Sequence, residues 1–129
     1  MIYLDSSALV KLLVQEAGSS EVESFIGSSL TSEEVLVTSR LTGLELSRFA
    51  FREGLPQGNV EQVMELLDEV DVTEEVIRAA KEIRHHTKSL DAIHLGTAEL
   101  LQVDFLATFD KHLADVAIRM GIESGPLPS

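Results

Sequence analysis

Residues 1–14, with the sequence MIYLDSSALVKLLV, join a short apolar segment to an amphipathic one and carry an aspartate where the two meet. Residues 1–5 are almost entirely apolar, which predicts a short buried strand. Apolar residues then recur at helical spacing, and Ser6 or Ser7 can cap the helix that begins here. Asp5 therefore ends a buried strand, where a carboxylate is costly unless other groups compensate its charge.

The rest of the sequence repeats this alternation of short apolar strands and amphipathic helices. Further strands are predicted at residues 34–39, 70–72 and 105–108. Helices are predicted from residue 20, at residues 41–52 and 60–67, from residue 74, and at residues 90–101 and 111–120. Thr73, Ser89 and a capping box of Ser20 with Glu23 are placed to start three of these helices. The alternation is typical of an α/β sandwich built on a parallel sheet.

Four acidic residues lie beside apolar segments, each near the start of a predicted helix or within its apolar face: Asp5, Glu45, Asp91 and Asp110. Ligands of parallel α/β sheets bind at the carboxyl ends of the strands, and Asp5 and Asp110 both follow strands. If folding gathers the four carboxylates, they form a site for a hard divalent cation such as Mg²⁺ or Mn²⁺. Such a site points to phosphoryl chemistry, with attack by water.

Each of these acids also has an ordinary structural explanation. Asp5 and Asp110 can cap the helices that follow them, and Asp91 lies in a first helical turn, where the helix dipole favours a negative charge. Glu45 can be a solvated helix residue that pairs with Arg48. No single position decides between a structural and a catalytic role.

The composition limits how the chain can bind nucleic acid. Ten Lys and Arg residues stand against 22 Asp and Glu residues, for a formal net charge of −12. Contacts with nucleic acid must therefore be local or made through metal, and a basic protein partner fits this charge equally well. The absence of cysteine excludes disulfides and fits a reducing compartment. The apolar N-terminal stretch is too short and too charged for a membrane span and lacks the basic start of a signal peptide, so we expect a cytoplasmic protein.

Four segments resemble the PIN-domain ribonucleases and occur in the order in which that family carries them. They are residues 1–9, residues 42–46 around Glu45, residues 90–98 with the sequence LDAIHLGTA, and residues 106–110 with the sequence LATFD. The resemblance covers essentially the whole chain, and the segment that begins at Asp91 is its most specific part. In size the chain is similar to the VapC-type toxins of bacterial and archaeal toxin–antitoxin pairs.

The resemblance implies a single PIN-like domain over residues 1–129, with a C-terminal strand remnant and tail at about residues 122–129. The implied fold has three layers, α/β/α, around a short and mostly parallel sheet of four to five strands. The implied partners are an RNA substrate, a second copy of the chain in a homodimer, and a VapB-type antitoxin whose tail occupies the active-site groove.

The resemblance also implies a metal-dependent endoribonuclease that uses Mg²⁺ or Mn²⁺ and leaves a 5′-phosphate and a 3′-hydroxyl. The residues that correspond to the catalytic and metal-binding acids of the family are Asp5, Glu45, Asp91 and Asp110. Ser6 and Thr108 correspond to hydroxyls that support this cluster. The alternative to an enzyme is a catalytically silent PIN-like binding module in which the acids are structural.

Four cationic side chains near the acids can either contact RNA or belong to the solvated surface: Arg48, Arg84, His86 and Lys88. His94 shares a helix face with Asp91. Neutral imidazole suits zinc or iron better than Mg²⁺, so we expect His94 to be a packed histidine or a support for a neighbouring ligand rather than a ligand itself.

Overall fold

All five strands of the central sheet run parallel in the computed structural model, which describes residues 1–129. The strand order is β3-β2-β1-β4-β5. The strands are short: β1 (Ile2–Leu4), β2 (Leu36–Ser39), β3 (Asp68–Val70), β4 (Phe105–Ala107) and β5 (Ser124–Gly125). The predicted α/β fold with four to five strands is confirmed, and the sheet is entirely rather than mostly parallel.

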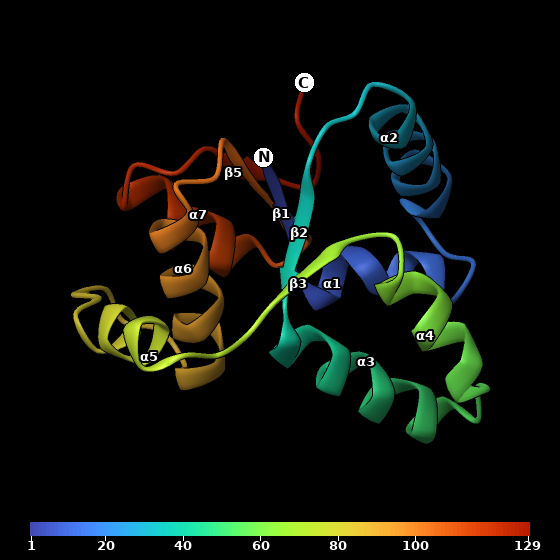
Figure 1. The fold of residues 1–129 in the computed structure, drawn as a ribbon, viewed down its shortest axis with the longest axis horizontal. Coiled ribbons are helices and arrows are strands. Elements are labelled where there is room, and N and C mark those ends of the chain that lie inside the picture. The colour runs from blue at the N-terminus through green and yellow to red at the C-terminus, as the bar shows by residue number, and fades with distance from the viewer.

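Helices lie on both sides of the sheet, which gives the fold three layers (Figure 1). One side holds α1 (Ser6–Leu9) with its 3₁₀ extension η1 (Val10–Leu12), α2 (Ser19–Thr31), α3 (Arg40–Glu53) and α4 (Gln57–Met64). The other side holds α5 (Glu74–Lys81), α6 (Ser89–Leu101) and α7 (Lys111–Arg119). Gly96 of α6 lets α5 approach closely, because a Cβ atom there would lie 3.0 Å from the backbone nitrogen of Ala80.

Strand β1 contributes to two hydrophobic cores, because successive side chains of a strand point to opposite faces. Ile2 and Leu4 belong to the core that packs against α1 to α4. Tyr3 belongs to the core shared with α6 and α7 and has no exposed surface. A phenol buried so completely needs a hydrogen-bond partner for its hydroxyl.

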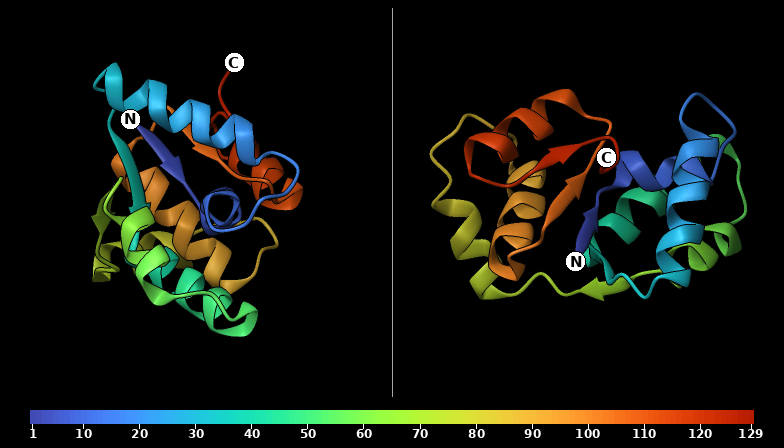
Figure 2. Two further views of the ribbon diagram at one scale, coloured as in Figure 1. Left: turned by 90° about the vertical axis from the view of Figure 1, so that its right-hand side faces the viewer. Right: turned by 90° about the horizontal axis from the view of Figure 1, so that it is seen from above.

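The order of the strands reverses at β1. From β1 the chain moves outward to β2 and β3, and then returns to place β4 and β5 on the other side of β1. Such a switch point opens a crevice at the carboxyl ends of the two adjacent strands. Strands β1 and β4 lie side by side (Figure 2). Leu4 of β1 is in register with Ala107 of β4, so Asp5 and Thr108 enter this crevice next to each other.

The first helix is capped by Asp5 and not by a serine, so the prediction of Ser6 or Ser7 as the cap is wrong. Strand β1 leads directly into α1, and Asp5 occupies the N-cap position between them. Its carboxylate accepts a hydrogen bond from the backbone nitrogen of Ala8 at 3.0 Å. This is the structural role that the sequence left open for Asp5, and it does not exclude a second role.

The predicted capping box of Ser20 and Glu23 is also wrong, because α2 begins at Ser19 after a glycine. Gly18 has φ +95°, in the left-handed region that favours glycine. A Cβ atom at this position would lie 2.9 Å from the ring of Phe109. The chain therefore enters α2 through a turn that only glycine fits.

Other boundaries differ from the predictions by a few residues. The N-cap position of α6 is Lys88, without a side-chain cap, because this helix begins at Ser89. Helix α4 starts directly after Pro56, earlier than predicted, and β3 is shifted in the same direction. Thr73 caps α5 as predicted, with its hydroxyl accepting from the backbone nitrogen of Val76. None of the helices combines the length and the apolar composition that crossing a membrane would require.

Candidate active site

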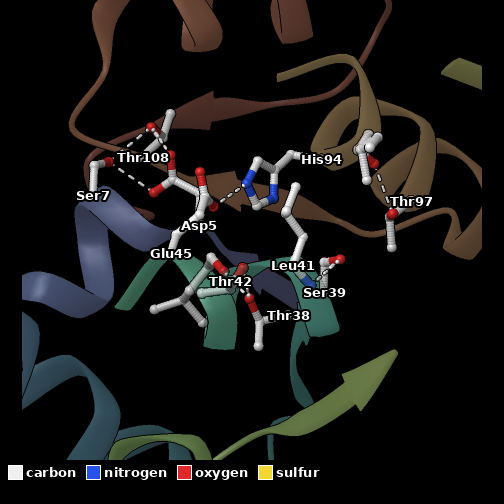
Figure 3. Close-up of polar contacts among 12 residues, drawn as sticks. Asp5, Ser7, Thr38, Ser39, Leu41, Thr42, Glu45, His94, Thr97 and Thr108 are labelled. Atoms are coloured by element: carbon white, nitrogen blue, oxygen red, sulfur yellow. Dashed lines mark hydrogen bonds and ion pairs between the residues drawn. The ribbon is translucent and has the colours of Figure 1, made fainter. Parts of the chain in front are cut away.

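Asp5 is buried at the end of β1 and is held by three donors. Its Oδ1 atom accepts from the Ser7 hydroxyl at 2.7 Å and from the Ala8 backbone nitrogen at 3.0 Å. Its Oδ2 atom accepts from the Thr108 hydroxyl at 2.6 Å (Figure 3). Burial raises the pKa of the Asp5 carboxyl, although the hydrogen bonds from Thr108 and Ser7 act in the opposite direction. A cation nearby would therefore stabilise the ionised form.

The hydroxyls of Ser7 and Thr108 join the start of α1 to the loop after β4. They lie 3.1 Å apart, and each also accepts from a backbone nitrogen of that loop: Ser7 from Phe109 and Thr108 from Asp110. We call Asp5, Ser7 and Thr108 the Asp5 corner. Thr108 supports Asp5 where the sequence placed it, but the second hydroxyl belongs to Ser7. Only the spacing of a hydroxyl two residues after an aspartate could have indicated Ser7.

Glu45 reaches the same end of the sheet from α3 and contacts a buried histidine of α6. Its Oε1 atom lies 2.8 Å from Nε2 of His94, and Nδ1 of His94 lies 2.5 Å from the hydroxyl of Tyr3. We call Tyr3, His94 and Glu45 the Glu45 relay. His94 is 2% exposed, which agrees with the expected packed histidine. Figure 3 shows His94 and Glu45 pointing toward each other, and through Tyr3 the relay joins α3 and α6 to β1.

Asp91 lies in the first turn of α6, half-buried, and its carboxylate has no hydrogen-bond partner in the protein. Burial raises the pKa of this carboxyl, and the negative charges of Asp110 and Glu45 raise it further. His94 and Lys88 act in the opposite direction. The charges of two of the other acids therefore act on Asp91.

Asp110 occupies the N-cap position of α7. Its Oδ1 atom accepts from the backbone nitrogens of His112 and Leu113 at 2.9 and 3.2 Å. The helix-cap explanation that the sequence left open is therefore realised. The second carboxylate oxygen makes no hydrogen bond, and the charge of Asp110 still acts on Asp91.

The donor set suits a hard cation, although the side chains are not yet arranged around one. The four acids offer only oxygen, and Glu45, Asp91 and Asp110 each keep at least one oxygen without a hydrogen bond, as ligation of Mg²⁺ or Mn²⁺ needs. No three Asp, Glu or His side chains converge closely enough in their present conformations to hold one ion. Binding would require the carboxylates to turn toward a common point, which unpartnered oxygens permit.

A groove of about 600 Å³ runs from this site along α1 and α3. Ser6, Ser7 and Glu45 lie on its wall, so the groove opens onto both the Asp5 corner and the Glu45 relay. Its remaining lining is apolar, aromatic or charged: Val10, Lys11, Glu16, Leu41, Leu44, Arg48, Phe49, Arg52, Leu90 and Phe109. The groove thus has a mixed lining in which Arg48 and Arg52 are the cations without an acidic partner, since Lys11 is paired with Glu16 at 3.0 Å.

The four cations selected from the sequence occupy different places. Arg48 lies on the groove wall, with its guanidinium 5.4 Å from the ring centroid of the exposed Phe51. Lys88 is exposed, and its charge acts on Asp91. Arg84 and His86 are exposed in the segment before α6 and do not line the groove.

The chain is similar to known proteins over most of its length. The sequence matches the PIN domain family over residues 2–119. It is 40% identical over 119 residues to ribonuclease VapC47 of Mycobacterium tuberculosis, a match that covers 88% of this chain and 87% of that protein.

Solved structures show the same fold at lower sequence identity. The crystal structure of Mycobacterium tuberculosis VapC20, described as a toxin that cleaves the sarcin–ricin loop, superposes with a TM-score of 0.73 at 16% identity. That match covers 89% of this chain and 94% of VapC20. A chain of a toxin–antitoxin complex from Klebsiella pneumoniae gives a TM-score of 0.67 at 18% identity, over 86% of this chain and 92% of that one. The chain therefore belongs to the PIN-domain family and, within it, to the VapC ribonucleases, the toxin family of toxin–antitoxin systems.

Proposed function

We propose that this chain is an endoribonuclease that depends on Mg²⁺ or Mn²⁺ and whose site is built from Asp5, Glu45, Asp91 and Asp110. The observation that carries the proposal is Asp91, a half-buried carboxylate without a protein donor, in the field of two further acids. A structural acid is satisfied by its neighbours, whereas an unsatisfied acid among like charges favours a bound cation.

The four acids would hold the ion, and the hydroxyls of the Asp5 corner keep Asp5 in a fixed orientation toward it. When bound, such an ion activates water and offsets the negative charge that develops on the phosphate. Attack of water on phosphorus would break the bond to the 3′ oxygen, which takes up a proton, and would leave a 5′-phosphate and a 3′-hydroxyl. The burial of Asp5 and His94 keeps bulk water from the inner side of the site.

Substrate RNA would lie in the groove beside Glu45. Arg48 and Arg52 on its wall supply local positive charge to a chain whose net charge is −12, whereas Lys11 is paired with Glu16. Phe49 on its wall offers an aromatic ring to a base, and stacking of this kind tolerates any sequence. Among the four cations predicted to contact RNA, Arg48 has the strongest support because it lines the groove. Lys88 follows, because its charge acts on Asp91.

The partners follow from membership of the toxin family. We infer that a VapB-type antitoxin with a basic segment binds the acidic site and inhibits it, that the chain forms homodimers, and that it acts in the cytoplasm, where its RNA is. One structural neighbour is itself part of a toxin–antitoxin complex.

A silent binding module remains the second candidate. It is favoured by the caps that Asp5 and Asp110 provide, and by the absence of three converging ligands. Under that reading the acids would be structural, and Asp91 would act only as a favourable negative charge in the first turn of α6.

Cleavage of labelled RNA by the purified chain, with Mn²⁺ and with a chelator, separates the two candidates. We expect cleavage that disappears on chelation and in Asp91→Asn. Asp115→Asn makes the same chemical change at an exposed position of α7 and should cleave like the parent. Cleavage that survives chelation, or equal loss in both variants, would contradict the carboxylate mechanism.

A further inference from the structure

The Glu45 relay contains a buried imidazole that the proposed chemistry does not use. His94 lies on α6, three residues after Asp91, and its Nε2 atom is 2.8 Å from Glu45. Its side chain is 2% exposed, whereas that of Glu45 is 27% exposed. The histidine therefore contacts Glu45 from the protein interior, while Glu45 also lines the groove.

The proton positions in the relay follow from the groups present. A carboxylate can only accept hydrogen bonds. The Nε2 atom of His94, which faces Glu45, must therefore carry a proton and donate it. In a neutral ring Nδ1 then accepts from the hydroxyl of Tyr3. Burial raises the pKa of that hydroxyl, so Tyr3 keeps the proton it donates. Every member of the relay then has a partner with the correct polarity.

The geometry of the relay restricts His94 to one orientation. Its ring meets the ring of Tyr3 edge to face, at 5.8 Å between centroids and an interplanar angle of 73°. Tyr3 is itself fully buried on β1, the central strand of the sheet, two residues before Asp5. Through His94 and Tyr3, the position of Glu45 Oε1 therefore depends on β1. Asp5 follows the same strand.

We propose that His94, oriented by Tyr3, is a positioning residue that holds one oxygen of the Glu45 carboxylate and leaves the other free to turn toward the divalent cation. The proposal rests on the proposed function, since it assigns His94 a role at that site. Glu45 is a flexible side chain on α3. Because His94 holds its Oε1 atom, only its Oε2 atom can turn toward the ion. Partners behind a metal-binding carboxylate commonly set its orientation and the affinity for the ion.

The test measures Mn²⁺ binding by calorimetry in the RNA-free protein, so that it does not depend on cleavage. His94→Leu removes the donor, and His94→Gln keeps an amide donor near the position of Nε2. We expect His94→Leu to weaken Mn²⁺ binding by about ten-fold or more, and His94→Gln to restore part of the loss. Thr97→Val is the matched control, because Thr97 is a buried hydroxyl of the same helix that donates only to the Ile93 carbonyl.

A second background shows whether His94 acts through Glu45. In Glu45→Ala there is no carboxylate to position, so adding His94→Leu should change Mn²⁺ affinity by less than about twofold. An equal loss in both backgrounds would overturn the proposal, as would parent-like affinity in His94→Leu. A parent chain that binds no Mn²⁺ would instead overturn the proposed function, and the positioning role with it.

Nuclear magnetic resonance of the His94 ring keeps the proposal testable if His94→Leu does not fold. A proton on Nε2 is expected in the parent. A neutral ring protonated only on Nδ1 would present no donor to Glu45 and would overturn the proposal.

Discussion

Asp5 and Asp91 lie at the same end of the sheet, yet the protein treats their carboxylates in opposite ways. Asp5 is almost fully buried and accepts from Ser7, Ala8 and Thr108, whereas Asp91 is half-buried and accepts from nothing. Both oxygens of Asp5 already accept hydrogen bonds within the protein. Only a bound ion or another group from outside the protein can stabilise the charge of Asp91 by direct contact. The difference suggests that one acid fixes the frame of the site and the other depends on the ion.

The largest expected effect is the loss of RNA cleavage in the Asp91→Asn variant. Removing a ligand charge at nearly constant volume should lower the rate of RNA cleavage by at least about 100-fold, as loss of a principal electrostatic contact does. Because Asp91 has no protein partner to lose, the melting temperature without metal should not fall. Cleavage assays and circular-dichroism melts measure the two quantities. A melt well below that of the parent would show that Asp91 is structural.

The next effect is on stability and distinguishes the two acids. Asp5→Ala removes a helix cap and leaves two hydroxyls without their acceptor, so we expect the free energy of unfolding to fall by about 2 kcal/mol. Asp91→Ala should change it by no more than about 0.5 kcal/mol. Urea unfolding of both variants without divalent ions measures the difference. Equal losses would remove the contrast between the two acids.

A smaller effect is expected where α2 packs against the loop of the Asp5 corner. Gly18→Ala places a Cβ atom in a left-handed conformation and 2.9 Å from Phe109, so we expect a loss of about 1–2 kcal/mol. Gly27→Ala, in the middle of α2 with nothing within 4 Å of the added atom, should instead be neutral or stabilising. Thermal melts of the pair check this. A stable Gly18→Ala variant would mean that this turn does not constrain the corner.

The smallest expected effect is a dependence of stability on pH without divalent ions. The pKa of Asp91 is raised above its usual value of 3.8, so the folded state holds its proton more tightly than the unfolded chain does. The resulting stabilisation is complete below the unfolded pKa and is lost as pH rises through the folded pKa. Urea unfolding of the parent from pH 3.5 upward, compared with Asp91→Asn, isolates this contribution. A steeper loss of stability in the variant would contradict the sign.

The parts of the site that follow strand ends could be predicted from the sequence. Asp5 and Thr108 enter the crevice because β1 and β4 are parallel neighbours, and apolar runs that end in polar residues reveal such strands. The helix-capping roles of Asp5 and Asp110 can also be predicted from the sequence, because capping depends only on neighbouring residues.

The Glu45 relay could not be predicted in this way. Its contacts join Tyr3 to His94 and His94 to Glu45 across 91 and 49 residues of sequence. The packing of α3 and α6 on the two sides of β1 decides them, and no local pattern encodes that packing. Ser7 was missed for a related reason, because rotation of the first helical turn decides which of two adjacent serines faces Asp5.

The most direct test of a site completed by a divalent ion is the melting temperature of the RNA-free chain, measured with a chelator and then with Mn²⁺. An ion that binds only the folded state at 100 times its dissociation constant adds about 2.7 kcal/mol of stability. We predict a clear rise in melting temperature for the parent that Asp91→Asn abolishes. An unchanged melt in saturating Mn²⁺, or an equal rise in both proteins, would contradict the account.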